Sequence, residues 1–430
     1  MSFDIALSGI QAINEALNST SQNIANAGTF GYKAQRANFS SLVSGELQTG
    51  VTIGSITQNI SKPGGVLSTG RSLDAAINGG GFFISKAANS DVPQYSRVGI
   101  FETSKDGYLV DTQGNRVQGY PINPLTSAMG AVGDLPIQTG AIPAVASGKM
   151  TYIGNMSADW TTPAAWGTVP VTGTGTVPIT PQNPPDPSTF NMSKATVIYD
   201  TLGGKHTLTQ YFARDAASPN TVNVRYLLDG AELPDKTPTV LKFNTATGSL
   251  NDVNGQPADP VTGAIASTTT VDLTGITLAN GGKLTKLTID YDGSTGNSGE
   301  ATTSANNAEG YASGTYTSLA LGNDGSLIAT YSNGQKQTVG KLALATFVNE
   351  GALTTISGTS WTESLESGRP LVNAPGTGTG GTITSSSLEQ SNVDITSELV
   401  GLMTSQRNYQ ANSKVIQTES TMMQSLMQAI

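Results

Sequence analysis

Histidine is the side chain best suited to acid–base and metal chemistry near neutral pH, and this chain contains one, His206. The chain has no cysteine, so a metal site at His206 would have to gather carboxylates from elsewhere in the sequence. His206 follows a pair of glycines in a segment with the pattern of a β-strand. We therefore expect a surface or strand histidine with no catalytic or metal-binding role.

Residues 290–300, DYDGSTGNSGE, begin with acidic residues spaced as in a calcium-binding loop. Such a loop needs a glycine at its sixth position and a bidentate glutamate at its twelfth. Those two positions hold Thr295 and Ala301 in this chain. We expect a polar turn here, and we predict neither a metal ion nor a cofactor.

Two glycine runs, at 78–83 (NGGGFF) and 376–381 (GTGTGG), have the composition of phosphate-binding loops. Neither run lies between a strand and a helix, and neither is followed by the Lys-Ser/Thr pair that such loops carry. The sequence also lacks the Gly-x-Ser-x-Gly elbow that holds a serine nucleophile. These observations predict turns instead of an active site, and they predict that the protein is not an enzyme.

The composition favours a β-rich protein with many tight turns, because the 430 residues include 50 glycines and 20 prolines and only 12% are charged. A chain of this length is expected to form two or three domains. The net charge is −9 and there is no basic run, so we predict no nucleic-acid binding. No apolar run approaches about 18 residues, so we predict no membrane insertion. The first residues, MSFDIALSG, lack the pattern of a secretory signal peptide.

An amphipathic helix is predicted at the N-terminus, because apolar residues recur at steps of four and three from Phe3 to Ile24. Gly28 is expected to end this helix near Ala27 by adopting a left-handed conformation. The turn NIANAGTFGYK, residues 23–33, would then lead the chain out of the helical region.

A second helix with the same alternation is predicted from Ile395 to the C-terminus, capped by Asp394 or Ser397. It would extend for about 35 residues, or roughly 50 Å. Neither helix is expected to be stable alone, so we predict that the two pair as an α-helical coiled coil. Both are poor in charged residues, which favours packing against several neighbours at once.

Between the helices, Asp-Gly and Asn-Gly pairs that separate alternating apolar runs predict β-hairpins. The predicted fold class is multidomain and mainly β with terminal α-helices, in which two β domains are nested. The predicted boundaries are 1–28 with 391–430 for the helical coiled-coil domain, 29–72 with 383–390 for an extended connector with a hairpin, 73–145 with 312–382 for a middle β domain, and 146–311 for an inserted outer β domain.

Four segments of the chain resemble the signatures of bacterial flagellar rod and hook proteins, in the same order along the chain. They are NIANAGTFGYKAQRANF at 23–39, LDAAINGGGFF at 73–83, YSRVGIFETSKDGYLVDTQGNRVQGY at 95–120 and SLEQSNVDITSELVGLMTSQRNYQANSKVIQT at 387–418. They cover both ends of the chain and the flanks of the inserted region, which has no comparable signature. The length and the insertion resemble the hook members of this family more than the shorter rod proteins.

The resemblance implies a structural subunit that polymerises into a curved hollow helical tube, the flagellar hook. That tube acts as a universal joint, which transmits motor torque to the filament, and as an export channel. The terminal helices would line the channel. The implied location is the flagellum at the cell exterior, reached by export without a cleaved signal peptide. The implied partners are other copies of the chain, the distal rod protein, the hook cap, the hook-length control protein, the hook–filament junction protein and the flagellar type III export apparatus.

We expect contacts between subunits to involve apolar residues of the two helices, each of which could equally belong to the core of one subunit. These are Leu7, Ile10, Leu17, Ile24, Leu399, Leu402, Tyr409, Ile416 and Met423. The turn of the first signature would depend on Asn23, Asn26, Gly28, Gly31 and Tyr32. Three alternatives remain from the sequence. The first is another flagellar axial protein, such as the distal rod. The second is a β-rich surface adhesin, which would carry a signal peptide and no paired terminal helices. The third is an enzyme on this scaffold, which would need a polar cleft in the inserted domain, and the sequence offers none.

Overall fold

The computed structural model describes residues 2–44, 47–88, 90–123, 126–167, 185–233, 237–256, 267–274, 276, 278 and 280–429. The chain divides into two compact units. The first consists of Met1–Thr139, Thr317–Thr330 and Lys336–Ile430, and the second consists of Gly140–Tyr316 and Tyr331–Gln335. Both ends of the chain therefore belong to the first unit.

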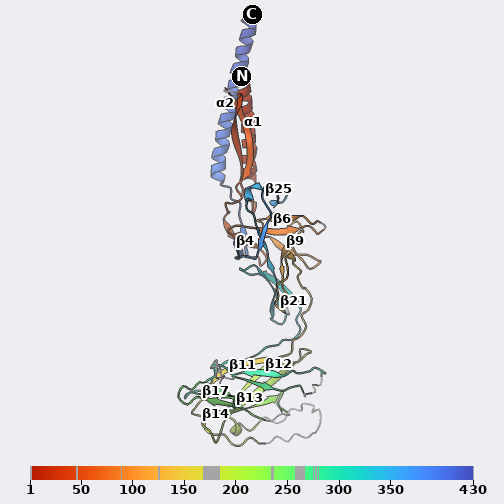
Figure 1. Ribbon diagram of the computed structural model, residues 1–430, viewed down its shortest axis with the longest axis vertical. Helices are drawn as coiled ribbons and strands as arrows, with labels where there is room; N and C mark the ends of the chain where they lie inside the picture. The colour runs from red at the N-terminus through yellow and green to blue at the C-terminus, as the bar shows by residue number, and fades with distance from the viewer. Residues whose placement is uncertain are drawn as a thin grey trace. The chain divides into compact units, whose positions relative to one another are not determined.

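The helices at the two ends of the chain lie against each other, α1 over Ser2–Ala25 and α2 over Ile395–Ala429 (Figure 1). α2 begins where it was predicted to begin. Asp394 caps it, because its Oδ1 accepts hydrogen bonds from the backbone N–H groups of Thr396 at 3.0 Å and Ser397 at 3.3 Å. The hydroxyl and backbone N–H of Ser397 hold the pKa of the Asp394 carboxyl below its usual value. The predicted fold class, mainly β with paired terminal helices, is confirmed.

The end of α1 differs from the prediction, because the helix stops at Ala25 and Gly28 does not cap it. Gly28 has no positive φ angle, and a Cβ placed on it would have open space around it. A turn continues past the helix instead, with Asn26 N donating to Gln22 O at 3.0 Å. The left-handed glycine of this turn is Gly31, with a φ of +69°.

A long antiparallel hairpin follows the turn and packs along α1, with strands β1 (Gln35–Ser44) and β2 (Leu47–Gln58). Ser8 of α1 accepts a hydrogen bond from the backbone N–H of Val51 at 3.2 Å. A Cβ on Gly50 would overlap the Ser8 hydroxyl, so the strand reaches the helix only because residue 50 is glycine. Both the hairpin and α2 therefore pack against α1.

A branched sheet of thirteen described strands forms the β part of the first unit. Its strands are β5 (Phe82–Lys86), β6 (Pro93–Ser96), β7 (Phe101–Thr103), β8 (Leu109–Asp111), β9 (Arg116–Pro121), β10 (Gly133–Asp134), β21 (Tyr316–Leu321), β22 (Ser326–Tyr331), β23 (Lys336–Leu342), β24 (Leu344–Thr346), β25 (Thr354–Ile356), β26 (Ser360–Thr362) and β27 (Leu371–Asn373). Because β23 pairs with β9, strands from before and after the second unit share this sheet. Its core is aromatic, with Phe82 packed edge-on against Trp361 and Phe347.

Two short strand pairs attach the C-terminal segment to the first unit. They are β28 (Thr382–Ser385) with β4 (Ala75–Asn78), and β29 (Ser387–Glu389) with β3 (Val66–Ser68). The two glycine runs meet beside the β28–β4 pair, where Gly381 N donates to Gly80 O at 2.8 Å. A Cβ on Gly381 would lie 2.5 Å from Asn78 O, so this approach requires glycine. The prediction that both runs form turns is confirmed.

The second unit contains two sheets that share one hydrophobic core. One sheet holds β11 (Lys149–Asn155), β18 (Thr268–Val271), β19 (Leu287–Asp290) and β20 (Thr302–Ala308), and the other holds β12 (Met192–Tyr199), β13 (Lys205–Arg214), β14 (Thr221–Leu228), β15 (Ala231–Glu232), β16 (Thr239–Phe243) and β17 (Leu250–Val253). A buried polar network crosses this core. Tyr291 OH donates to Gln210 Oε1 at 2.6 Å and lies 2.8 Å from Tyr226 OH. Short 3-10 helices occur at Pro187–Thr189 (η1) and Glu350–Ala352 (η2).

His206 lies in strand β13, as predicted, and its ring is held between two carboxylates. Nδ1 lies 2.7 Å from Asp229 Oδ2, and Nε2 lies 3.3 Å from Asp200 Oδ2. The segment 290–300 forms a turn in which Thr295 Oγ1 donates to Asn155 Oδ1 at 2.9 Å. In the described part of the chain, no cluster of His, Asp or Glu side chains is arranged to hold a metal ion. Neither described α-helix combines the length and the apolarity needed to cross a membrane.

Candidate functional site at the base of the helices

Asn23, near the end of α1, is the side chain on which four chain segments converge. Its Oδ1 accepts hydrogen bonds from the backbone N–H of Gln35 at 2.8 Å and from the Tyr32 hydroxyl at 3.3 Å. Its Nδ2 donates to Gln35 O at 2.8 Å and to Glu398 Oε1 of α2 at 2.8 Å. Asn23 is buried, so this amide satisfies its donors and acceptors entirely within the protein. It joins α1, the turn, the start of β1 and α2.

Gly31 brings the turn into contact with the β part of the first unit. Its N–H donates to Glu389 O at 2.8 Å. A Cβ on Gly31 would lie 2.9 Å from Val98 Cγ2 and 3.1 Å from Val98 N, and its φ of +69° is unfavourable for other residues. Two independent constraints therefore require glycine at this position. Asn26 stabilises the preceding part of the turn, because its Oδ1 accepts a hydrogen bond from Thr29 Oγ1 at 3.2 Å.

A buried ionic cluster lies beneath this turn. Glu389 Oε1 accepts hydrogen bonds from Lys33 Nζ at 2.7 Å and from Gly64 N at 3.0 Å, and Glu389 Oε2 lies 3.3 Å from Arg97. The side chains of Lys33 and Glu389 are each only 1% exposed. Burial lowers the pKa of Lys33, although the hydrogen bond and the charge of Glu389 oppose that shift. Removal of Glu389 would leave two buried cations without a counter-ion.

Asn392 completes the connection just before α2. Its Oδ1 accepts a hydrogen bond from Ala34 N at 2.8 Å, and its Nδ2 donates to the carbonyls of Asn59 and Lys62, each at 2.9 Å. Lys33 Nζ donates to the same Lys62 carbonyl at 2.8 Å. We call the set formed by Asn23, Gly31, Tyr32, Lys33, Arg97, Glu389, Asn392 and Glu398 the polar junction. It fixes the base of both helices to the hairpin and to the sheet.

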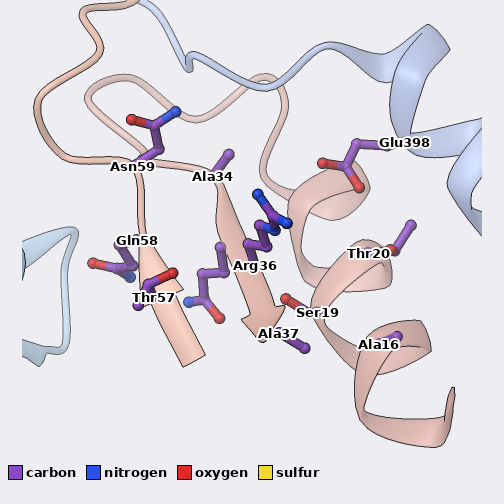
Figure 2. Close-up of a pocket in the computed structure, with 11 residues that line it drawn as sticks. Ala16, Ser19, Thr20, Ala34, Arg36, Ala37, Thr57, Gln58, Asn59 and Glu398 are labelled. Carbon is purple, nitrogen blue, oxygen red and sulfur yellow. The ribbon is translucent and has the colours of Figure 1, made fainter. Parts of the chain in front are cut away.

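A polar groove of about 520 Å³ opens beside the junction, between α1, the base of the hairpin and the start of α2. Figure 2 shows Arg36 and Glu398 pointing into this groove from opposite walls, with Ser19 and Thr20 on α1. Ser19 Oγ is buried and has no hydrogen-bond partner among the residues that the structure describes. Burial and the negative charge of Glu398 raise the pKa of the neighbouring Tyr32.

The comparisons with known proteins agree with this arrangement of the chain. Residues 76–178 match the family described as "Flagellar hook protein FlgE/F/G D1 domain", 168–311 match "Flagellar basal body protein FlaE D2 domain", and 384–429 match "Flagellar basal body rod FlgEFG protein C-terminal". The flagellar hook protein FlgE of Salmonella typhimurium is 32% identical over 99% of both chains, and that of Escherichia coli K12 is also 32% identical over 99% of both. The chain belongs to the flagellar hook protein family.

A solved structure shows the same fold at a much lower identity. The hook protein FlgE2 of Helicobacter pylori is 14% identical, covers 75% of this chain and 100% of its own, and gives a TM-score of 0.50. The hook protein FlgE of Brucella suis is 30% identical over 97% of this chain and 96% of its own length. The family relationship therefore extends along the whole chain, including the inserted region.

In this member of the hook protein family, the predicted contact residues remain largely uncovered within one chain. Leu7, Leu399, Tyr409 and Met423 are exposed, with fractions from 39% for Tyr409 to 62% for Met423. The others are half-buried: Ile10, Leu17, Ile24, Leu402 and Ile416. The structure of a single chain leaves their role between subunits as a prediction.

The residues of α1 that are buried within one chain are not the large apolar residues that recur at steps of four and three. Its buried residues are Ala6, Ala12, Ser19 and Asn23, all of them small or polar. Gly9 lies so close to α2 that a Cβ would be 2.9 Å from Asn412 Nδ2. Within one chain, α1 approaches its neighbours through small side chains, and the large apolar side chains of the stripe remain exposed or half-buried.

Sequence reasoning named Asn23, Gly31 and Tyr32 but missed the charged part of the junction. The available signal was the charge pattern, since Glu389 is the one charged residue between positions 370 and 393. An isolated carboxylate in an uncharged segment often has a structural partner. The sequence could not predict that Lys33 and Arg97 are its partners, because both lie hundreds of residues away along the chain.

Proposed function

We propose that this chain is the structural subunit of the flagellar hook and that it polymerises into a curved, hollow helical tube. The tube would transmit motor torque to the filament as a universal joint and provide an export channel along its axis. Family membership over the whole chain supports the hook assignment. The two relatives that align over 99% of their length are both named flagellar hook proteins. We therefore set aside the distal rod and the surface adhesin as alternatives.

The observation that carries this proposal is the apolar surface of the helical region. Exposed large apolar side chains lie on α1, on the hairpin and on α2, including Phe3, Leu7, Phe39, Ile53, Ile56, Leu399, Met403, Met422, Met423, Leu426 and Met427. Large apolar side chains exposed on neighbouring elements in this way suggest an interaction site. We propose that α2 of one copy contacts the hairpin of the next without the reverse contact. Such a contact is heterologous, and heterologous contacts that do not close build filaments.

We assign the parts of the chain to layers of the tube. Residues 1–28 with 391–430 would surround the channel, and 29–72 with 383–390 would connect them to the next layer. Residues 73–145 with 312–382 would form the middle layer and 146–311 the outer one. The polar junction supports this assignment, because it gives the helices a fixed base on the middle β part.

The finer assignments concern partners and location. The chain would leave the cell through the flagellar type III export apparatus without a cleaved signal peptide, assemble beneath the hook cap, and contact the distal rod protein below and the hook–filament junction protein above. A hook-length control protein would limit the polymer. In all of these roles, this chain would act as a structural protein and not as an enzyme.

Assembly of the purified chain tests the proposal. We expect the full chain, concentrated in a salting-out buffer, to form hollow tubes visible by negative-stain electron microscopy and to sediment at high speed. A chain that ends at residue 394, and so lacks α2, should remain monomeric while its sheets keep their circular dichroism spectrum. A full chain that stays monomeric even on preformed hook fragments used as seeds would contradict the proposal.

A further inference from the structure

α1 and α2 pair in one antiparallel register that leaves the end of α2 without a partner. Asn23 faces Glu398 through a 2.8 Å hydrogen bond, and Gly9 faces Asn412. In each pair the two residue numbers add to the same value, so Ser2, the first residue of α1, faces Glu419. Residues 420–429 therefore extend past α1 by about 15 Å. Figure 1 shows the C-terminus lying beyond the N-terminus in this way.

This overhang, residues 420–429, has an unusual surface. It carries no charged residue, and Met422, Met423, Leu426 and Met427 are between 59% and 74% exposed. The hydroxyls of Thr421 and Ser425 are occupied, because each donates to a carbonyl one turn earlier in α2. Gln424 and Gln428 remain as exposed carboxamides, four residues apart and so on one face of the helix.

The polar groove presents the complementary set of groups. Arg36 makes no ion pair or side-chain hydrogen bond within the described residues, and Glu398 uses only Oε1, to accept from Asn23. A cation and a carboxylate on opposite walls suit a neutral group that both accepts and donates. A primary carboxamide does so, because its C=O accepts from a guanidinium while its NH₂ donates to a carboxylate. The buried, unpartnered Ser19 Oγ on the α1 wall is a further polar group without a ligand in one chain.

We propose that the overhang of one copy docks in the polar groove of the next copy, with Gln424 or Gln428 between Arg36 and Glu398. The methionines beside these glutamines would cover the exposed apolar face of the hairpin near the groove. The overhang lies at the distal end of the helical pair and the groove at its base, so the contact runs head to tail along the axis. Between two copies that point in the same direction, this contact cannot close on itself, and it extends the polymer. This inference rests on the proposed function, because its second copy is the neighbour in the hook.

Cysteine cross-linking tests this contact, since the chain contains no cysteine of its own. One set of chains carries Arg36→Cys and a size tag, and a second set carries Gln424→Cys or Gln428→Cys. The two are polymerised together and oxidised. We expect a mixed disulfide dimer in the tubes for at least one glutamine position, and no such dimer in the unpolymerised chains. Thr57→Cys, on the β2 side of the groove, provides a second partner if Arg36→Cys disturbs assembly.

Matched controls separate this contact from general proximity. Met422→Cys points to the opposite face of the overhang from Gln424 and should give a much weaker mixed dimer. Arg36→Ala should raise the critical concentration for assembly by about tenfold, the usual effect of losing one charge-assisted hydrogen bond, whereas Lys414→Ala should not. Tubes that form with no mixed dimer at any groove position would overturn the inference and leave the hook function intact. Failure of the unsubstituted chain to polymerise would overturn both.

Discussion

Asn23 and Glu398 are 375 residues apart in the chain and are joined by a 2.8 Å hydrogen bond at the base of the two terminal helices. The same Asn23 side chain receives the backbone N–H of Gln35 and donates to its carbonyl. One amide therefore sets the end of α1, the start of the hairpin and the first turn of α2. Through Asn23, the turn near the N-terminus is connected to the C-terminal helix.

Replacing Asn23 with alanine should loosen the helical region without unfolding the sheets. The change leaves the partly buried N–H and C=O of Gln35 without their side-chain partner, at a cost of about 1–3 kcal/mol. We expect faster amide hydrogen exchange at Gln35 and along α1, with unchanged exchange in strands β5 and β9. Gln22→Ala, at the exposed neighbouring position, is the control and should leave exchange at Gln35 unchanged. Equal exchange in Asn23→Ala and the unsubstituted chain would show that the junction does not depend on this amide.

Glu389→Ala should be among the most destabilising single changes in the first unit. It leaves Lys33 and Arg97 buried without their counter-ion, which typically costs about 3–5 kcal/mol. The free energy of unfolding of the first unit, followed by amide hydrogen exchange in strand β5 of its core, measures the effect. The exposed Glu366 offers a matched control, because Glu366→Ala should change that free energy by less than about 0.5 kcal/mol. Similar losses for the two substitutions would contradict the role of the cluster.

Two glycines of the same turn should respond differently to alanine. Gly31→Ala introduces a Cβ against Val98 in a left-handed conformation, and should destabilise the first unit by about 1–3 kcal/mol. Gly28→Ala meets open space at an ordinary φ and should be neutral or slightly stabilising. Thermal unfolding of the two variants checks the contrast. A larger loss for Gly28→Ala would mean that the left-handed residue of the turn has been misassigned.

The second unit should lose stability in alkaline solution because of its buried tyrosines. Burial raises the pKa of Tyr226 to about 12, while hydrogen bonds with Thr239 and Tyr291 act in the opposite direction. Tyrosines in the unfolded chain ionise near pH 10. Above that pH the folded state therefore binds more protons than the unfolded state does. The free energy of unfolding then falls as the pH rises through about 12. Below pH 10 this contribution is fully present.

Denaturant unfolding between pH 8 and 12, with tyrosinate absorbance as the second signal, measures this dependence. Tyr226→Phe should flatten the decline, whereas Phe substitution at the exposed Tyr409 of α2 should not. An unchanged slope in Tyr226→Phe would show that other groups cause the alkaline loss.

The sequence was informative where a local pattern determines the structure. The steps of four and three predicted both helices, Asp394 predicted the start of α2, and the Asp-Gly and Asn-Gly pairs predicted the hairpin turns, where Gly107, Gly325 and Gly334 have positive φ angles. These features depend on residues a few positions apart, so one sequence is enough to find them.

The packing of the helices and the charged cluster could not be predicted in the same way. Apolar periodicity identifies the large residues of α1, whereas Ala6, Ala12, Ser19 and Asn23 are the ones buried within one chain, because the hairpin and α2 approach closely. The pairing of Lys33 with Glu389 joins residues 356 positions apart. A single sequence does not indicate which residues of two distant segments lie opposite each other. Their contact is therefore visible only in the folded structure.

Helical reconstruction of the assembled polymer by cryo-electron microscopy tests the central claim most directly. We predict a hollow tube in which α1 and α2 surround the channel, paired in the register set by Asn23 and Glu398, with the polar junction intact in every subunit. A tube whose channel is lined by the β units, or whose terminal helices are separated from each other and from the hairpin, would contradict it.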